Sequence, residues 1–155
     1  MDFLFEVIFL LNIIFNLLVA EFVGFFSSFL VSDISIKYLN FIKPAFSAPG
    51  FIFPIVWVIL YFLMAVANFL ASENRKANYL YSMQLLINFL WPIFFFGLDL
   101  KLFSFIWLIF LFVMVIITTK EFSKTNIIAA VLMLPYIFWL IYAGYLNFEI
   151  WQLNR

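Results

Sequence analysis

The sequence contains no cysteine and no histidine, and only 10% of its 155 residues are charged. Without cysteine the chain forms no disulfide and offers no thiol nucleophile or thiolate metal ligand. Without histidine it lacks the commonest general base and the commonest metal ligand, including the usual ligand of haem iron. It also has no glycine-rich phosphate-binding motif. The residue types therefore predict neither a catalytic constellation nor a metal site.

An excess of positive charge is lacking as well, because eight Lys and Arg balance eight Asp and Glu. Such a chain presents no basic face that could neutralise the phosphates of a nucleic acid. Hydrophobic residues are abundant instead, at 68% of the chain, with 24% aromatic. A soluble domain has roughly 45–50% apolar and about 25% charged residues. This composition excludes a soluble globular or disordered chain and indicates an integral membrane protein.

The apolar residues are arranged in long runs without charge, at 44–72, 77–98, 102–119 and 125–148. A helix needs about 20 largely apolar residues to cross a membrane. The first stretch, 3–31, is also apolar but carries Glu6 and Glu21. We therefore predict one all-α membrane domain over 1–155, a bundle of five helices that span the membrane at roughly 3–31, 49–72, 77–97, 102–122 and 125–152.

The orientation of this multi-pass bundle is not determined by its charges. With five helices the termini lie on opposite faces, and each face then carries four basic residues. One face has Arg75, Lys76, Lys120 and Lys124, and the other has Lys37, Lys43, Lys101 and Arg155. The positive-inside rule therefore favours neither orientation. The longest connection is predicted to be a loop over 32–43.

Aromatic and amide side chains recur at helical spacing in three of the predicted spans. The stripes are Trp57, Tyr61 and Met64; Gln84, Asn88, Trp91 and Phe95; and Tyr136, Trp139, Ala143 and Asn147. One interpretation is an aromatic-walled cavity whose amides orient a flat ligand. The other is that Asn88 and Asn147 only join helices through hydrogen bonds, which is the commoner role of such residues. Spacing alone favours the second interpretation.

Prolines and carboxylates within the spans add two hypotheses. Pro54, Pro92 and Pro135 each remove a backbone donor and can kink a helix. Glu21 lies deep in the first span, and a carboxylate in that position is by default a functional hypothesis. A proton pathway would need a chain of ionisable residues, which Glu21 alone does not provide.

Specific motifs then connect the chain to a known family. They are KPAFSAPG at 43–50, FPIVW at 53–57, Leu60-Tyr61, Gln84-Leu85, Asn88, Trp91, FFG at 95–97, LPY at 134–136, Trp139, Ala143, LNF at 146–148, Trp151 and Asn154. Their order and spacing resemble the TspO/MBR family of tryptophan-rich sensory proteins and translocator proteins (peripheral benzodiazepine receptors). The resemblance covers the chain from about residue 43 to its end, while the first helix matches only in position and hydrophobicity.

The resemblance implies a five-helix bundle, a homodimer in membrane lipid, and a cavity that the first loop covers. It implies a receptor or sensor whose ligand is a porphyrin such as protoporphyrin IX or another flat apolar molecule, with no cofactor required. The ligand-binding residues would be Trp57, Tyr61, Asn88, Trp91, Phe95, Trp139, Ala143 and Asn147, with Phe46 and Pro49 from the loop. Because these are largely the residues of the stripes, a binding cavity becomes the better interpretation.

Departures from the family pattern leave alternatives open. Ala45 and Phe46 stand where tryptophans often occur in the family loop. Some bacterial members degrade porphyrin in light, and phenylalanine is less easily oxidised than indole. Phe148 and Gln152 replace the Tyr and Arg of a sterol-recognition pattern, so that motif does not predict cholesterol binding. The alternatives to a receptor are a light- and oxygen-dependent porphyrin-degrading enzyme and a transporter of porphyrin or lipid.

Overall fold

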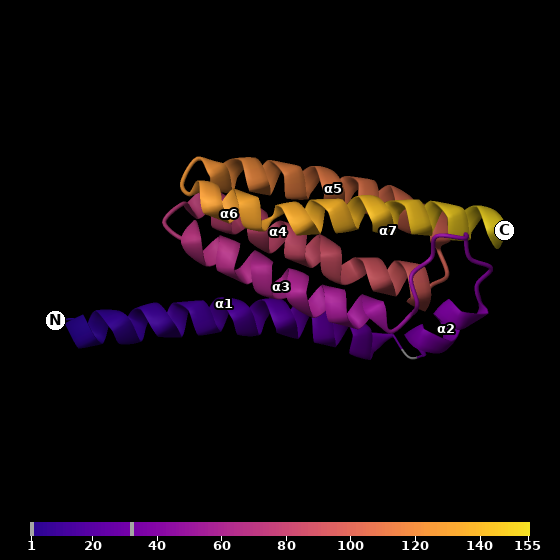
Figure 1. Ribbon diagram of the computed structural model, residues 1–155, viewed down its shortest axis with the longest axis horizontal. Coiled ribbons are helices and arrows are strands. Elements are labelled where there is room, and N and C mark those ends of the chain that lie inside the picture. The colour runs from indigo at the N-terminus through magenta and orange to yellow at the C-terminus, as the bar shows by residue number, and fades with distance from the viewer. Residues whose placement is uncertain (1, 32) are drawn as a thin grey trace.

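The computed structural model describes residues 2–31 and 33–155, and these residues form helices and no strands. The long helices run back and forth alongside one another (Figure 1). In chain order the elements are α1 (Asp2–Leu30), α2 (Ile34–Asn40), α3 (Ile52–Leu70), α4 (Arg75–Pro92), the π-helix η1 (Ile93–Gly97), α5 (Lys101–Ser123), α6 (Ile127–Leu132) and α7 (Leu134–Leu153).

Four of the helical segments are long and apolar enough to cross a membrane: Ile52–Leu70, Arg75–Gly97, Lys101–Ser123 and Ile127–Leu153. The 29-residue α1 is the fifth long helix, with an apolar stretch at Ile13–Ser27 among its described residues. The bounds of these five long helical segments lie within a few residues of the predicted ranges. An all-α, multi-pass membrane bundle is thereby confirmed. The side chain of Glu6 lies outside the described residues.

Two asparagines explain where the helices at one end of the bundle begin. The side chain of Asn74 accepts hydrogen bonds from the backbone amides of Lys76 and Ala77, each at 3.1 Å. Asn126 accepts in the same way from Ile128 at 2.9 Å and Ala129 at 3.4 Å. An asparagine at this position satisfies amides that have no partner in the first turn of a helix.

The three prolines within the spans have different effects. Pro54 lies in the first turn of α3, where a missing backbone donor costs little. Pro92 ends α4, and the chain continues as the π-helix η1, in which the amide of Leu98 bonds to the carbonyl of Ile93 at 2.8 Å. Pro135 lies at the start of α7, and the predicted span 125–152 is therefore two helices, α6 and α7. Two of the three predicted kinks thus occur as interruptions.

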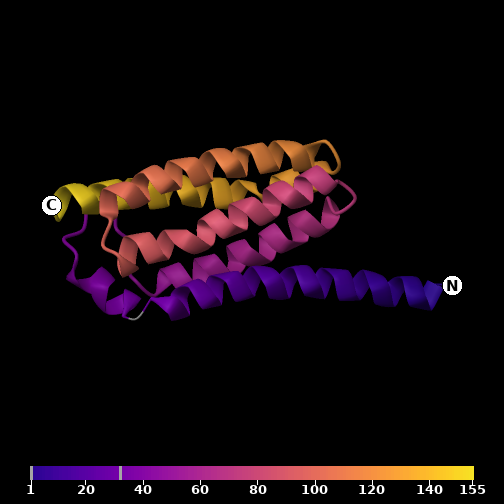
Figure 2. The ribbon, with the colours of Figure 1, turned by 180° about the vertical axis from the view of Figure 1, so that it is seen from behind.

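The two ends of the bundle are built differently. The α1 helix lies beside α3, and its N-terminal part extends beyond the bundle, as both views show (Figures 1 and 2). At that end, α6 and the connection between α3 and α4 meet. At the other end, α2 and the segment that follows it run up to the C-terminal part of α7 and back to the start of α3 (Figure 1). This second end positions the candidate site.

Candidate ligand-binding cavity

A cavity of about 870 Å³ lies at the α2 end of the bundle. Its lining comes from α1, α2, α3, α4, η1 and α7, together with Val31 and Asp33 between α1 and α2 and Gly50 just before α3. Small-molecule sites in proteins typically measure about 300–1,000 Å³ and are mostly apolar with a few polar groups. The cavity has both the size and the character of such a site.

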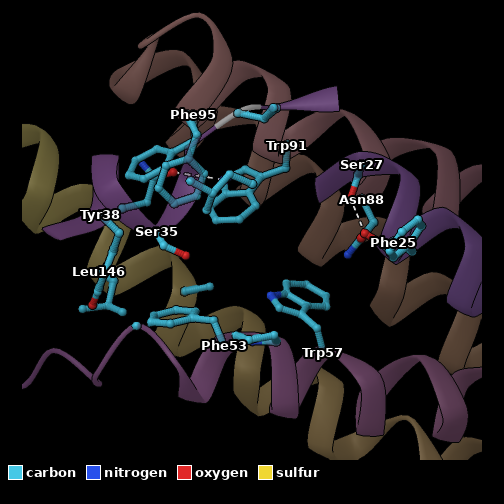
Figure 3. A pocket seen from close by; sticks show the side chains of 18 of the residues that line it. Phe25, Ser27, Ser35, Tyr38, Phe53, Trp57, Asn88, Trp91, Phe95 and Leu146 are labelled. Atoms are coloured by element: carbon cyan, nitrogen blue, oxygen red, sulfur yellow. Dashed lines mark hydrogen bonds between the residues drawn. The ribbon is translucent and has the colours of Figure 1, made fainter. Parts of the chain in front are cut away.

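Seven of the ten predicted ligand-binding residues line this cavity: Trp57, Tyr61, Asn88, Trp91, Phe95, Ala143 and Asn147. Figure 3 shows Trp91 and Phe95 on one side of the open space and Phe53 and Trp57 on the other. The Trp91 and Phe95 rings are stacked, with centroids 5.4 Å apart and planes 13° from parallel. Two aromatic walls thus face each other across a space that a flat molecule could occupy.

The other three predicted residues lie outside the lining. The side chain of Phe46 is 81% exposed, and Pro49 is exposed too. The loop that contains Phe46 and Pro49 is held through its backbone by the Tyr142 hydroxyl. This hydroxyl donates to the Phe46 carbonyl at 3.1 Å and accepts from the Ala48 amide at 2.7 Å. Trp139 packs behind Phe53, with ring centroids 5.6 Å apart. A direct role in binding for these three residues stays a prediction.

Asn88 both lines the cavity and joins helices. Its side-chain oxygen accepts from the Tyr61 hydroxyl at 2.6 Å, and its amide nitrogen donates to the Tyr136 hydroxyl at 2.7 Å. All three side chains are buried. The hydrogen bonds connect α3, α4 and α7 at the inner end of the cavity. The helix-joining interpretation of Asn88 therefore holds, and it accompanies a position in the cavity wall.

Asn147, nearer the α2 end, likewise lines the cavity and makes hydrogen bonds to other helices. Its side-chain oxygen accepts from the Trp91 indole at 3.1 Å, and its amide nitrogen donates to the carbonyl of Lys101 at 2.7 Å. The first bond fixes the plane of an indole ring that lines the cavity. Asn147 thus positions one of the aromatic walls.

The segment predicted as a loop over 32–43 contains a helix, and that prediction is wrong for α2. The helix brings Tyr38 into the lining of the cavity, where its ring packs edge-on against Phe53 with centroids 5.1 Å apart and its hydroxyl donates to the Ala48 carbonyl at 2.8 Å. Burial raises the pKa of the Tyr38 hydroxyl, the nearby Tyr142 adds to the shift, and a hydrogen bond with Ser47 opposes it. The hydroxyl therefore remains a donor near neutral pH and holds the loop to α2.

The first helix also supplies part of the wall that sequence reasoning missed. Glu21, Gly24 and Ser27 of α1 line the cavity, as does Val31 just after it, and of these the sequence had singled out only Glu21. Gly24 permits the close approach of α1 to α3, because a Cβ atom there would overlap the ring of Tyr61. A spacing of three or four residues between Glu21, Gly24, Ser27 and Val31 is the signal that could have identified this face.

Comparison with known proteins agrees with the motifs. The profile of the TspO/MBR family matches residues 14–152. The Tryptophan-rich protein TspO of Archaeoglobus fulgidus is 33% identical over 151 residues, which cover 94% of this chain and 98% of that protein. The protein of the same name from Chlorobaculum tepidum is 33% identical over 135 residues, covering 83% and 85%. The Translocator protein of Ovis aries is 30% identical over 126 residues, covering 76% and 75%. The chain belongs to the TspO/MBR family.

Proposed function

We propose that this membrane protein is a receptor or sensor that binds porphyrins, or other flat apolar molecules, between the aromatic walls of the cavity. The observation that carries the proposal is the 870 Å³ cavity with Trp91 and Phe95 facing Phe53 and Trp57. Burial and ring stacking would supply most of the binding free energy. A relative from Cereibacter sphaeroides, 33% identical over 120 residues, is named a Tryptophan-rich sensory protein, which supports the sensing role.

The test is a titration of the purified protein with protoporphyrin IX in the dark, followed by quenching of tryptophan fluorescence. Trp57 and Trp91 line the cavity, so a bound macrocycle should quench saturably. Trp57→Ala should weaken binding about tenfold, since removing a stacking indole from a buried wall costs on the order of 1.5 kcal/mol. Quenching that does not saturate would contradict the proposal.

Trp107→Ala is the matched control. Trp107 is a half-buried indole on α5 that packs on Phe94 and Phe103, and its nitrogen donates to the Ile87 carbonyl at 2.8 Å. It is outside the cavity lining. Affinity for protoporphyrin IX should stay within about twofold of the unchanged protein. An equal loss in both variants would mean that the porphyrin does not bind in the cavity.

Light-dependent degradation of porphyrin is a second candidate, because two oxidisable indoles, Trp57 and Trp91, line the cavity. Illumination in air should then bleach the porphyrin faster than in a protein-free control, and the Trp57→Phe/Trp91→Phe pair should abolish the difference. A receptor without this activity would leave the bleaching rate unchanged in every variant. Flux into proteoliposomes above leakage, lost in Asn88→Ala, would support a transporter instead.

A further inference from the structure

The charged side chains that line the cavity are of one sign. Glu21 comes from α1 and Asp33 precedes α2, and both are acidic. Among the described lining residues there is no Lys or Arg, and the chain has no His. The Trp57 indole also lines the cavity and carries no charge. Among the described residues, the charged side chains of this largely apolar lining are therefore both carboxylates.

The lysines at this end of the bundle are occupied elsewhere. The Lys37 ammonium donates to the Phe96 carbonyl at 2.8 Å. Lys43 donates to the carbonyls of Tyr38, Leu39 and Phe41 at 2.9–3.0 Å. Lys101 forms an ion pair with Asp99. These basic groups lie near the cavity, but none of them is in the lining or directed to its carboxylates.

The Glu21 carboxylate is half-buried and has no hydrogen bond or ion pair with any residue that the structure describes. Two other hydroxyls that line the cavity already donate hydrogen bonds within the protein. Ser27 donates to the carbonyl of Gly24 at 2.9 Å, and Tyr61 donates to Asn88 at 2.6 Å. A half-buried carboxylate with no partner favours a cation or a hydrogen-bond donor beside it and disfavours a second carboxylate.

We propose that the cavity selects, among flat apolar molecules, those that carry a positive charge, and that the Glu21 carboxylate pairs with that charge. This selectivity rests on the proposed function, because it concerns the ligand of the same cavity. A macrocycle with free carboxylates, such as protoporphyrin IX, must keep them away from Glu21 and Asp33. It should therefore bind more weakly than a neutral or cationic macrocycle of the same shape.

Three ligands with one aromatic body test the proposal. They are protoporphyrin IX, its neutral dimethyl ester, and its diamide with two protonated amine arms. Affinities are measured by fluorescence quenching in a non-ionic detergent, so that the micelle favours no charge. The cationic diamide should bind about tenfold more tightly than the dicarboxylate, with the ester in between, as expected for one unscreened charge contact at partial burial.

Glu21→Gln removes the charge and keeps the shape of the side chain. It should reduce the gap between the cationic and anionic ligands at least about threefold, while the affinity for the ester stays unchanged. Unchanged ester binding also shows that the variant is folded. The matched control is Glu149→Gln on α7, a half-buried residue outside the lining, which should leave all three affinities as they were.

The outcomes separate the two proposals. If the ester binds but the charge ranking is absent, reversed or unaffected by Glu21→Gln, the selectivity proposal is overturned and the receptor proposal stands. If none of the three ligands binds saturably, the receptor proposal fails too. If Glu21→Gln no longer binds the ester, the affinities of the three ligands are ranked in the unchanged protein and in Asp33→Asn instead, and this ranking decides. Asp33→Asn is suitable because Asp33 is an exposed residue outside the helices.

Discussion

The two ends of the bundle pack in opposite ways. At the end where α6 lies, buried alanines recur between the helices, beside the buried rings of Tyr81 and Phe122. Ala65, Ala67, Ala71, Ala77 and Ala129 are all fully buried. At the α2 end, the same α3 and α4 helices carry Trp57 and Trp91 in place of alanines, with the cavity between them. Small side chains let helix backbones approach closely, whereas rings hold them apart. We call the first the alanine end and the second the cavity end.

The polar contacts of the two ends differ in the same sense. At the alanine end, Glu121 forms ion pairs with Lys124 at 2.8 Å and Lys76 at 3.4 Å. The first ion pair lies at the end of α5, and the second joins the end of α5 to the start of α4. At the cavity end, side chains of α7 hold the backbone of the segment after α2, and Asn154 bonds to both the amide and the carbonyl of Ile42 at 2.9 and 2.8 Å. One end is held by packing and ion pairs, and at the other a segment is tethered by its backbone to α7 and Asn154.

The largest effect is expected at the boundary between the ends, from Asn88→Leu. The leucine has a similar volume but leaves the buried hydroxyls of Tyr61 and Tyr136 without their partner. Each unsatisfied buried group costs about 1–3 kcal/mol. Thermal unfolding in detergent should show a clear loss of stability, and protoporphyrin IX should bind more weakly. Tyr61→Phe, which removes only one of the two hydroxyls, should lose less; an equal loss would contradict the shared role of Asn88.

A somewhat smaller effect is expected within the alanine end, from Ala67→Leu. Ala67 is fully buried, and extra methylenes in a close-packed contact cost about 1–3 kcal/mol. Unfolding should occur at lower temperature, while the folded fraction binds porphyrin as before. Gly144→Ala is the control, because an added Cβ there meets no atom within 4 Å. If both variants unfold like the unchanged protein, the alanine end is looser than its burial indicates.

The sequence could predict those features of the two ends that are encoded by long apolar runs or by residues repeated at helical spacing. Charge-free runs predicted the long helices, and helical spacing selected Trp57, Asn88, Trp91 and Asn147, all of which line the cavity. The short α2 has only seven residues, which are too few turns for a periodic signal. It begins after Asp33, whose backbone is in the left-handed conformation. The contribution of Gly24 depends on where α1 meets Tyr61. The spacing of Glu21, Gly24 and Ser27 could mark a face of α1, but it does not reveal that this face meets Tyr61.

Gly24→Ala sharpens the comparison because it tests a close helix contact at the cavity end. The added methyl would overlap the ring of Tyr61, which is buried and bonded to Asn88 and cannot easily turn away. We expect α1 to shift from α3, with a loss of roughly 1 kcal/mol in stability and a few-fold weaker porphyrin binding. Gly144→Ala again controls for the change of residue type. Unchanged affinity would mean that α1 does not set the width of the cavity.

The smallest effect is expected from Phe46→Ala, and it separates the two ways in which the segment after α2 could close the cavity. If closure depends on the backbone tether, the exposed Phe46 ring contributes little, and porphyrin affinity should change less than about twofold. Tyr142→Phe removes the hydroxyl that bonds to Phe46 and Ala48. It should speed porphyrin dissociation in a stopped-flow measurement more than Phe46→Ala does, because the segment then opens more easily. The reverse order would mean that the Phe46 ring folds onto the bound ligand, as the family resemblance implies.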